Sequence, residues 1–128
     1  MGDYQPSVVT VDDDRANLRL MQTILEDRGF RAHTVVDSRN AVNEICRIIP
    51  DVVLLDIMMP HLNGYEVAEQ IRNEPVLKDI LVIAVSTLNG EEHDRQAAAA
   101  GIDCQLTKPV DKDELNWTIR AALKQRQG

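Results

Sequence analysis

The 128-residue chain has two cysteines, few aromatic side chains and no long apolar run. Cys46 and Cys104 lie far apart and have no Cys or His at metal-ligand spacing, which argues against a zinc site and a disulfide framework. Every apolar stretch is too short to span a bilayer, and no charged segment at the start leads into an apolar leader. We therefore expect a cytoplasmic protein without membrane insertion.

Basic residues are also scarce. The chain has 14 lysines and arginines against 21 acidic residues, and its net charge is −7. Because duplex nucleic acid is bound through basic surfaces, we expect no direct contact with nucleic acid. Hydrophobic residues make up 44% of the sequence and charged residues 27%, which is typical of a globular domain that buries its own core. Residues 1–128 are predicted to form a single domain.

The sequence does contain a regular alternation of strand-like and helix-like segments, repeated five times. The strand-like segments are 8–11, 31–36, 52–55, 80–85 and 104–107. The helix-like segments are 14–28, 38–49, 63–74, 90–100 and a last one from 111. Four of the strands are apolar enough to be buried on both faces, as the strands of parallel sheets are. The alternation predicts an α/β fold with a doubly wound, five-stranded parallel sheet and five helices.

Capping residues mark several helix starts. Ser38 is a candidate N-cap of the second helix, and Asn63 with Glu66 forms a variant capping box for the third. Asp14 fits an acid in the first turn of the first helix. In the second helix, Ile49 is expected to face inward with the other apolar side chains.

Chemically capable side chains follow four of the predicted strands. They are Asp12, Asp13, Asp56, Ser86 and Lys108. The carboxyl ends of parallel strands meet at one edge of the sheet, where α/β proteins bind ligands, so these groups are predicted to converge. Close carboxylates repel one another by roughly a few kcal/mol per pair, and Mg2+ is a cation that prefers oxygen ligands. A carboxylate can also act as the nucleophile in phosphoryl transfer.

Each of these residues alone has an ordinary explanation. Acids after a strand are commonly N-caps or solvated loop residues, Ser86 could be a loop hydroxyl, and Lys108 could be a surface lysine. The combination at four strand ends, in order along the chain, favours a site for a divalent metal and a phosphoryl group.

This combination resembles the receiver domain of two-component response regulators, from about Ser7 to Gln125. The matching segments are V-D-D-D at 11–14, D-I-M-M-P-H-L-N-G at 56–64, A-V-S at 84–86 and K-P at 108–109. The resemblance implies the strand order 2-1-3-4-5, which is known from chemotaxis regulators. It also implies a cis peptide bond between Lys108 and Pro109, which proline tolerates.

The resemblance further implies a role for each site residue. Asp56 is expected to accept a phosphoryl group from a sensor histidine kinase or a histidine phosphotransfer protein. Mg2+ is expected on Asp13, Asp56 and the backbone carbonyl of Met58, with Asp12 acting largely through water. The phosphoryl-binding and switch residues would be Ser86, Thr87 and Lys108, and the structural residues Pro60, Gly64 and Pro109. Such a domain catalyses only its own phosphotransfer and slow dephosphorylation, and an effector would dock on the face of the fourth helix, fifth strand and fifth helix.

Two departures from the family pattern, at Gln105 and Thr87, and the apolar residues Met58 and Leu88 beside the site modify these expectations. Gln105 stands where an aromatic residue commonly couples the hydroxyl residue to the output face, so that coupling is expected to be weak or to take another route. Thr87 replaces a small residue and is expected to crowd the phosphoryl pocket. Met58 and Leu88 offer no polar side chain that could position an attacking water, which predicts slow loss of the phosphoryl group from Asp56.

Two alternative functions remain open from the sequence. A phosphatase of the haloacid dehalogenase type also uses an aspartate nucleophile and Mg2+, but it needs a second acid two residues later, where this chain has Met58. A degenerate receiver domain used only for protein contacts would lack some of the acids or the lysine, and here all are present.

Overall fold

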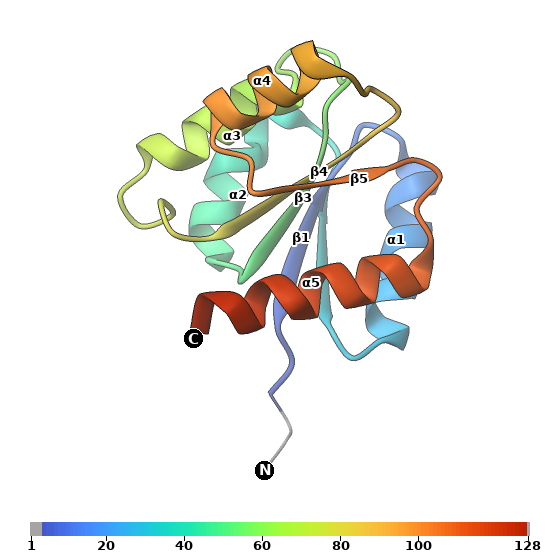
Figure 1. Ribbon diagram of the computed structural model, residues 1–128. Coiled ribbons are helices and arrows are strands. Elements are labelled where there is room, and N and C mark those ends of the chain that lie inside the picture. Colours follow the sequence, from blue (N-terminus) through green and yellow to red (C-terminus); the bar gives the residue numbers. More distant parts are fainter. Residues whose placement is uncertain (1–3, 128) are drawn as a thin grey trace.

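The computed structural model describes residues 4–127 and confirms the predicted alternation of strands and helices (Figure 1). The strands are β1 (Ser7–Val11), β2 (Arg31–Val35), β3 (Val52–Asp56), β4 (Leu81–Ser86) and β5 (Cys104–Thr107). The helices are α1 (Arg15–Asp27), the 3-10 turn η1 (Ser38–Asn40), α2 (Ala41–Ile48), α3 (Gly64–Asn73), α4 (Glu91–Ala100) and α5 (Lys112–Gln127). All strand pairs are parallel, and the order β2-β1-β3-β4-β5 is the expected one. The predicted domain, 1–128, also includes residues 1–3 and 128, which lie outside the described part.

The sheet is covered by helices on both faces, with α1 and α5 on one side and α2, α3 and α4 on the other (Figure 1). Successive strand residues alternate between the two layers because side chains in a strand point to opposite faces. Val8 and Leu54 pack with Leu25 of α1 and Ile119 of α5. Val9, Val11 and their counterparts in β3 pack with α2, α3 and the end of α4. The buried central strands therefore form a rigid base for the loops at their ends.

Side-chain caps fix the start of α1 and α3, the helices that follow β1 and β3. Asn63 accepts the backbone N–H of Glu66 at 2.9 Å, and the Glu66 carboxylate accepts the N–H of Asn63 at 2.8 Å, which confirms the capping box. Asp14 is the N-cap of α1 and accepts the N–H of Ala16 at 2.9 Å. It therefore lies immediately before the first turn of the helix and not, as predicted, within that turn. These caps hold the loops that follow β1 and β3.

Two predictions for the second helix are wrong. Ser38 is not its N-cap, because residues 38–40 form a separate 3-10 turn that is capped by Asp37, and α2 begins only at Ala41. Ile49 does not face inward. It lies just past the end of α2 with φ 49°, and it is 55% exposed. The left-handed conformation ends the helix and turns this side chain away from the core.

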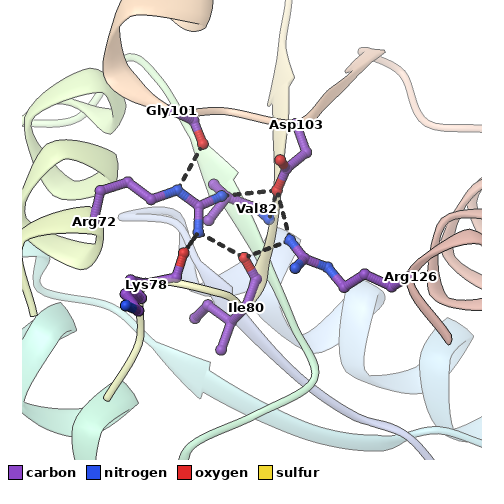
Figure 2. Close-up of polar contacts among 7 residues, drawn as sticks. All are labelled: Arg72, Lys78, Ile80, Val82, Gly101, Asp103 and Arg126. Atoms are coloured by element: carbon purple, nitrogen blue, oxygen red, sulfur yellow. Dashed lines mark hydrogen bonds and ion pairs between the residues drawn. The ribbon is translucent and has the colours of Figure 1, made fainter. Parts of the chain in front are cut away.

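A cluster of polar contacts closes the edge of the sheet where β4 begins and β5 approaches (Figure 2). Arg72 donates to the carbonyl oxygens of Gly101 (2.9 Å), Lys78 (2.8 Å) and Ile80 (2.7 Å), and it pairs with the Asp103 carboxylate at 2.8 Å. The same Asp103 oxygen accepts the N–H of Val82 at 2.9 Å. This group, called the Arg72 node below, ties α3 to β4 and to the segment between α4 and β5.

Among the described residues, no helix has both the length and the apolar character that crossing a membrane would need.

Candidate functional site

Three carboxylates meet at the carboxyl edge of the sheet, as the sequence predicts. β1 and β3 pair in a register that aligns Val11 with Leu55, and its continuation brings Asp12 beside Asp56. Asp12, Asp13 and Asp56 each offer an oxygen within 4.8 Å of the others. Asp12 and Asp56 are buried, whereas Asp13 is exposed. An all-oxygen set with one open side fits Mg2+, which uses few protein ligands and keeps several waters.

Lys108 lies on the same edge as the acids. Its Nζ is 3.1 Å from Asp56 Oδ1 and 3.6 Å from Asp12 Oδ2. The Lys108 backbone N–H donates to the Ser86 carbonyl at 3.0 Å, which anchors the start of the β5–α5 loop against β4. The amine from the end of the chain and the acids from its start and middle therefore share one site.

The charges in this site do not balance. Burial raises the pKa of the Asp56 carboxyl above its usual range, and the nearby Asp12 carboxylate raises it further against the opposing effect of Lys108. Burial alone would lower the pKa of the Lys108 ammonium, but the hydrogen bond to Asp56 and the charge of Asp12 raise it above its ordinary value. Lys108 is thus held in its charged form, and the surplus negative charge favours a further cation.

The hydroxyl and proline positions also lie at this edge. Ser86 is buried at the end of β4, and its Oγ accepts the N–H of Leu88 at 2.9 Å. The Lys108–Pro109 bond is cis, as expected. Thr87 is exposed and lines a cavity of about 330 Å³ with Lys108, Pro109 and apolar residues of α1. Crowding of a phosphoryl pocket by Thr87 stays a prediction.

The loop between Asp56 and α3 carries the remaining predicted residues. Met58 is 66% exposed, so its side chain leaves the carboxylates, and Pro60 is exposed as well. Gly64 is buried, and a Cβ at this position would lie 2.5 Å from the carbonyl oxygen of Asp56 and 2.8 Å from the Cα of Ile57. Only glycine lets α3 begin this close to the end of β3. That distance supports a structural role for Gly64.

Several contacts around the site have no counterpart in the sequence-based prediction. The Ser38 hydroxyl bonds to the loop after Asp56, through Pro60 and Leu62. The Tyr65 hydroxyl and His93 Nδ1 form a hydrogen bond that joins α3 to α4. Gln105 donates to Asp94 of α4 at 3.3 Å. These residues are 11 to 28 positions apart, and no short motif links them.

The sequence matches a known family over most of its length. Residues 8–120 match the response regulator receiver domain. Response regulator PleD of Caulobacter vibrioides is 33% identical over 117 residues, which cover 91% of this chain and 26% of PleD. Protein PilG of Pseudomonas aeruginosa is 33% identical over 114 residues, which cover 89% of this chain and 84% of PilG. The chain thus spans about a quarter of PleD and most of PilG.

Solved structures agree with this assignment. The receiver domain of Francisella response regulator 1452 has a TM-score of 0.86 and 29% identity, covering 94% of this chain and 98% of that chain. Chemotaxis protein CheY4 of Vibrio cholerae has a TM-score of 0.88 at 24% identity, covering 92% and 98%, and it shares the fold. With the acidic cluster and Lys108 in place, the chain belongs to the response regulator receiver domain family, the signalling domain of two-component response regulators.

Proposed function

We propose that this domain accepts a phosphoryl group on Asp56 in a reaction that depends on Mg2+, and that it thereby acts as a switch. The observation that carries the proposal is the cluster of Asp12, Asp13 and Asp56 beside the ammonium group of Lys108. Three acids and one amine match the charges of a divalent cation and a phosphoryl group better than they match one another.

The metal would be held by Asp13, Asp56 and the backbone carbonyl of Met58, with Asp12 largely acting through water. Asp12 is oriented for this role because its Oδ1 accepts the N–H of Asp14 at 2.9 Å, which leaves Oδ2 toward Lys108. When bound, Mg2+ would neutralise oxygens of the incoming phosphoryl group. The exposure of Asp13 leaves the approach open to solvent and to a phosphodonor.

The proposed transfer is a displacement at phosphorus. An oxygen of the Asp56 carboxylate attacks the phosphorus of a phosphohistidine, so that an O–P bond forms and the P–N bond breaks. The leaving nitrogen keeps the electron pair and takes a proton from solvent, which gives an aspartyl phosphate and a neutral imidazole. Lys108 would pair with a phosphoryl oxygen, and the Ser86 hydroxyl would turn from Leu88 to donate to another.

The proposed partners follow from the family. A sensor histidine kinase or a histidine phosphotransfer protein would supply the phosphoryl group, and an effector would bind the face of α4, β5 and α5. On that face, Trp117 is 71% exposed, and the Gln105–Asp94 hydrogen bond joins β5 to α4. With Gln105 in place of an aromatic side chain, this bond is a candidate route from Ser86 to the effector. We also propose a cytoplasmic location and, from the net charge of −7, no direct contact with nucleic acid.

We expect the aspartyl phosphate to be long-lived. The side chains of Met58 and Leu88 are 66% and 37% exposed beside the loops of the site, and neither has a polar group that could orient an attacking water. After phosphorylation with acetyl phosphate and removal of the donor, decay is followed by intact mass. A half-life of seconds would contradict this expectation.

Intact mass spectrometry with acetyl phosphate tests the proposal. Wild type should gain one phosphoryl group with Mg2+ and almost none with a chelator, and Asp56→Asn should gain none. Asp51→Asn is the matched control, because Asp51 accepts the N–H of Ser7 at 2.8 Å at the other end of the sheet. A wild-type protein that stays unmodified, or an Asp56→Asn variant that is modified equally, would overturn the proposal. Continuous release of phosphate from a small ester would instead indicate a phosphatase.

A further inference from the structure

The Ser38 hydroxyl connects two loops that are far apart in the sequence. Ser38 is 3% exposed and lies in the 3-10 turn before α2. Its Oγ donates to the carbonyl of Pro60 at 2.9 Å and accepts the N–H of Leu62 at 3.1 Å. One buried hydroxyl thus uses its donor and an acceptor site on the loop that follows Asp56.

The two bonds enclose a residue with an unusual backbone. His61, between Pro60 and Leu62, has φ 70°, a left-handed conformation that non-glycine residues adopt at a cost. A contact on each side of such a residue holds the loop in this shape, because either flanking group would lose its partner if the backbone relaxed.

Ser38 is itself fixed in place. Asp37 caps the 3-10 turn by accepting the N–H of Arg39 at 2.9 Å, and the Arg39 guanidinium pairs with the same carboxylate at 2.8 Å. Hydrogen bonds from the Arg39 side chain and backbone lower the pKa of Asp37 to about 2, so the carboxylate is charged at neutral pH. The hydroxyl is therefore presented from a turn that has its own hydrogen bonds.

The loop held by Ser38 is the one that would complete the metal site. Its far end is set by Gly64, whose N–H donates to the carbonyl of Ile57 at 2.9 Å, and by the Asn63 capping box. Met58 lies between Asp56 and the Ser38 contacts, and its exposed side chain does little to fix its backbone. The direction of the Met58 carbonyl thus depends on the rest of the loop.

We propose that Ser38 is a positioning residue for metal binding: its hydroxyl holds the loop of residues 57–63 so that the Met58 backbone carbonyl can join Asp12, Asp13 and Asp56 around Mg2+. This inference rests on the function proposed above. Ser38 touches neither the metal nor the phosphoryl group. It acts by restricting the loop before the ion arrives, which lowers the entropy lost on binding.

The test compares Mg2+ affinity in folded variants by isothermal titration calorimetry. Ser38→Ala should weaken Mg2+ binding by about fivefold. This factor corresponds to the typical net contribution of one hydrogen bond to the free energy. Ser7→Ala is the matched control, because Ser7 is also buried and its Oγ accepts the N–H of Asp51 at 3.3 Å, at the opposite end of the sheet. Ser7→Ala should lower stability and leave Mg2+ affinity unchanged.

The rate of phosphorylation by acetyl phosphate separates positioning from chemistry. In Ser38→Ala the Mg2+ concentration at half-maximal rate should rise by the same factor, and the rate at saturating Mg2+ should match wild type. Unchanged Mg2+ affinity, or an equal loss in Ser7→Ala, would overturn the inference while leaving the proposed function intact. A wild-type protein that binds no Mg2+ would remove both.

A measurement on the wild-type protein needs no substitution. If the Ser38–Leu62 bond favours Mg2+ binding, then Mg2+ must favour that bond to the same degree, because coupling is reciprocal. Hydrogen exchange of the Leu62 amide should therefore slow by about fivefold on saturation with Mg2+. In Asp13→Asn, Mg2+ should have little effect on this amide. Leu62 exchange that is the same with and without Mg2+ in wild type would overturn the inference.

Discussion

Charged side chains gather at both ends of the sheet, but their charges are compensated within the chain at one end and not at the other. At the amino ends of β4 and β5, the Arg72 guanidinium contacts three carbonyls and Asp103, and its side chain is 21% exposed (Figure 2). At the carboxyl ends, the acidic cluster of Asp12, Asp13 and Asp56 pairs, among residues 4–127, with the single cation Lys108.

This difference separates a structural site from a functional one. In the Arg72 node each charged group has partners within the chain, so nothing further needs to bind there. In the acidic cluster, Asp13 has no ion pair among the described residues, and Asp56 is buried beside Asp12 with a raised pKa. Surplus charge of one sign in a partly buried site is stable mainly when a ligand compensates it.

The largest effect should come from breaking the Arg72 node. Arg72→Ala removes four polar contacts, three of them to backbone carbonyls, and leaves the Asp103 carboxylate with the more distant Arg126 as its remaining cation. The free energy of unfolding should therefore fall by about 3 kcal/mol. Urea unfolding followed by circular dichroism measures this. Arg47→Ala is the control, because Arg47 pairs with Glu44 at the surface with 68% of its side chain exposed, and it should cost less than about 0.5 kcal/mol. Equal costs would mean that the node is no anchor.

At the carboxyl end of the sheet, where the acidic cluster lies, the free energy of unfolding should depend on Mg2+. Mg2+ at one hundred times its dissociation constant should stabilise wild type by about 2.7 kcal/mol, since it binds the folded state alone. Asp13→Asn should lose most of this response. Asp103→Asn, an acid removed from the opposite edge, should be less stable but should keep the full response. If Asp103→Asn lost the response as well, the two ends could not be treated as separate.

The free energy of unfolding, measured against pH without metal, should show the cost of ionising Asp56 in the folded protein. A raised folded-state pKa means that this carboxyl supports folding below its unfolded pKa and loses that contribution as pH rises through the folded value. Asp56→Asn has no such titration, and Lys108 keeps Asp12 as a partner. The variant should therefore be more stable than wild type at pH 7, with the difference vanishing near pH 3. A variant that is less stable at pH 7 would contradict the imbalance.

The smallest effect should come from Arg126 of α5, a second arginine that contacts Asp103 and the Ile80 carbonyl of the Arg72 node (Figure 2). Arg126 lies 3.6 Å from the Asp103 carboxylate and is 37% exposed, and Arg72 already satisfies that acid. Arg126→Ala should therefore lower the free energy of unfolding by no more than about 0.5 kcal/mol in the same urea experiment. A loss as large as that of Arg72→Ala would show that the node depends on both arginines.

The sequence predicts the parts of the molecule that local pattern determines. Strand and helix alternation follows from the apolar runs. Asp56 and Lys108 could be placed because Asp56 ends β3 and Lys108 directly follows β5. The Asn63 capping box was recognisable because its partners are three residues apart. Ile49 was misplaced because helical periodicity does not indicate where a left-handed residue ends the helix.

Contacts between distant loops could not be predicted in this way. The sequence suggested a helix cap at Ser38 because serine commonly has that role. Its actual partners are 22 and 24 residues away, so no local pattern reveals them. Arg72 had no local signal, since its carboxylate partner is 31 positions later in the chain. Both depend on how the loops pack once the sheet has formed, so they appear only in three dimensions.

The most direct test of the central claim identifies which of the three clustered acids is modified. Protein treated with acetyl phosphate and Mg2+ is reduced with borohydride, which converts an acyl phosphate of aspartate into homoserine, and the position is read by peptide sequencing in a mass spectrometer. We predict homoserine at position 56 alone, with none when Mg2+ is chelated. Homoserine at position 12 or 13, or at none of the three, would contradict the account.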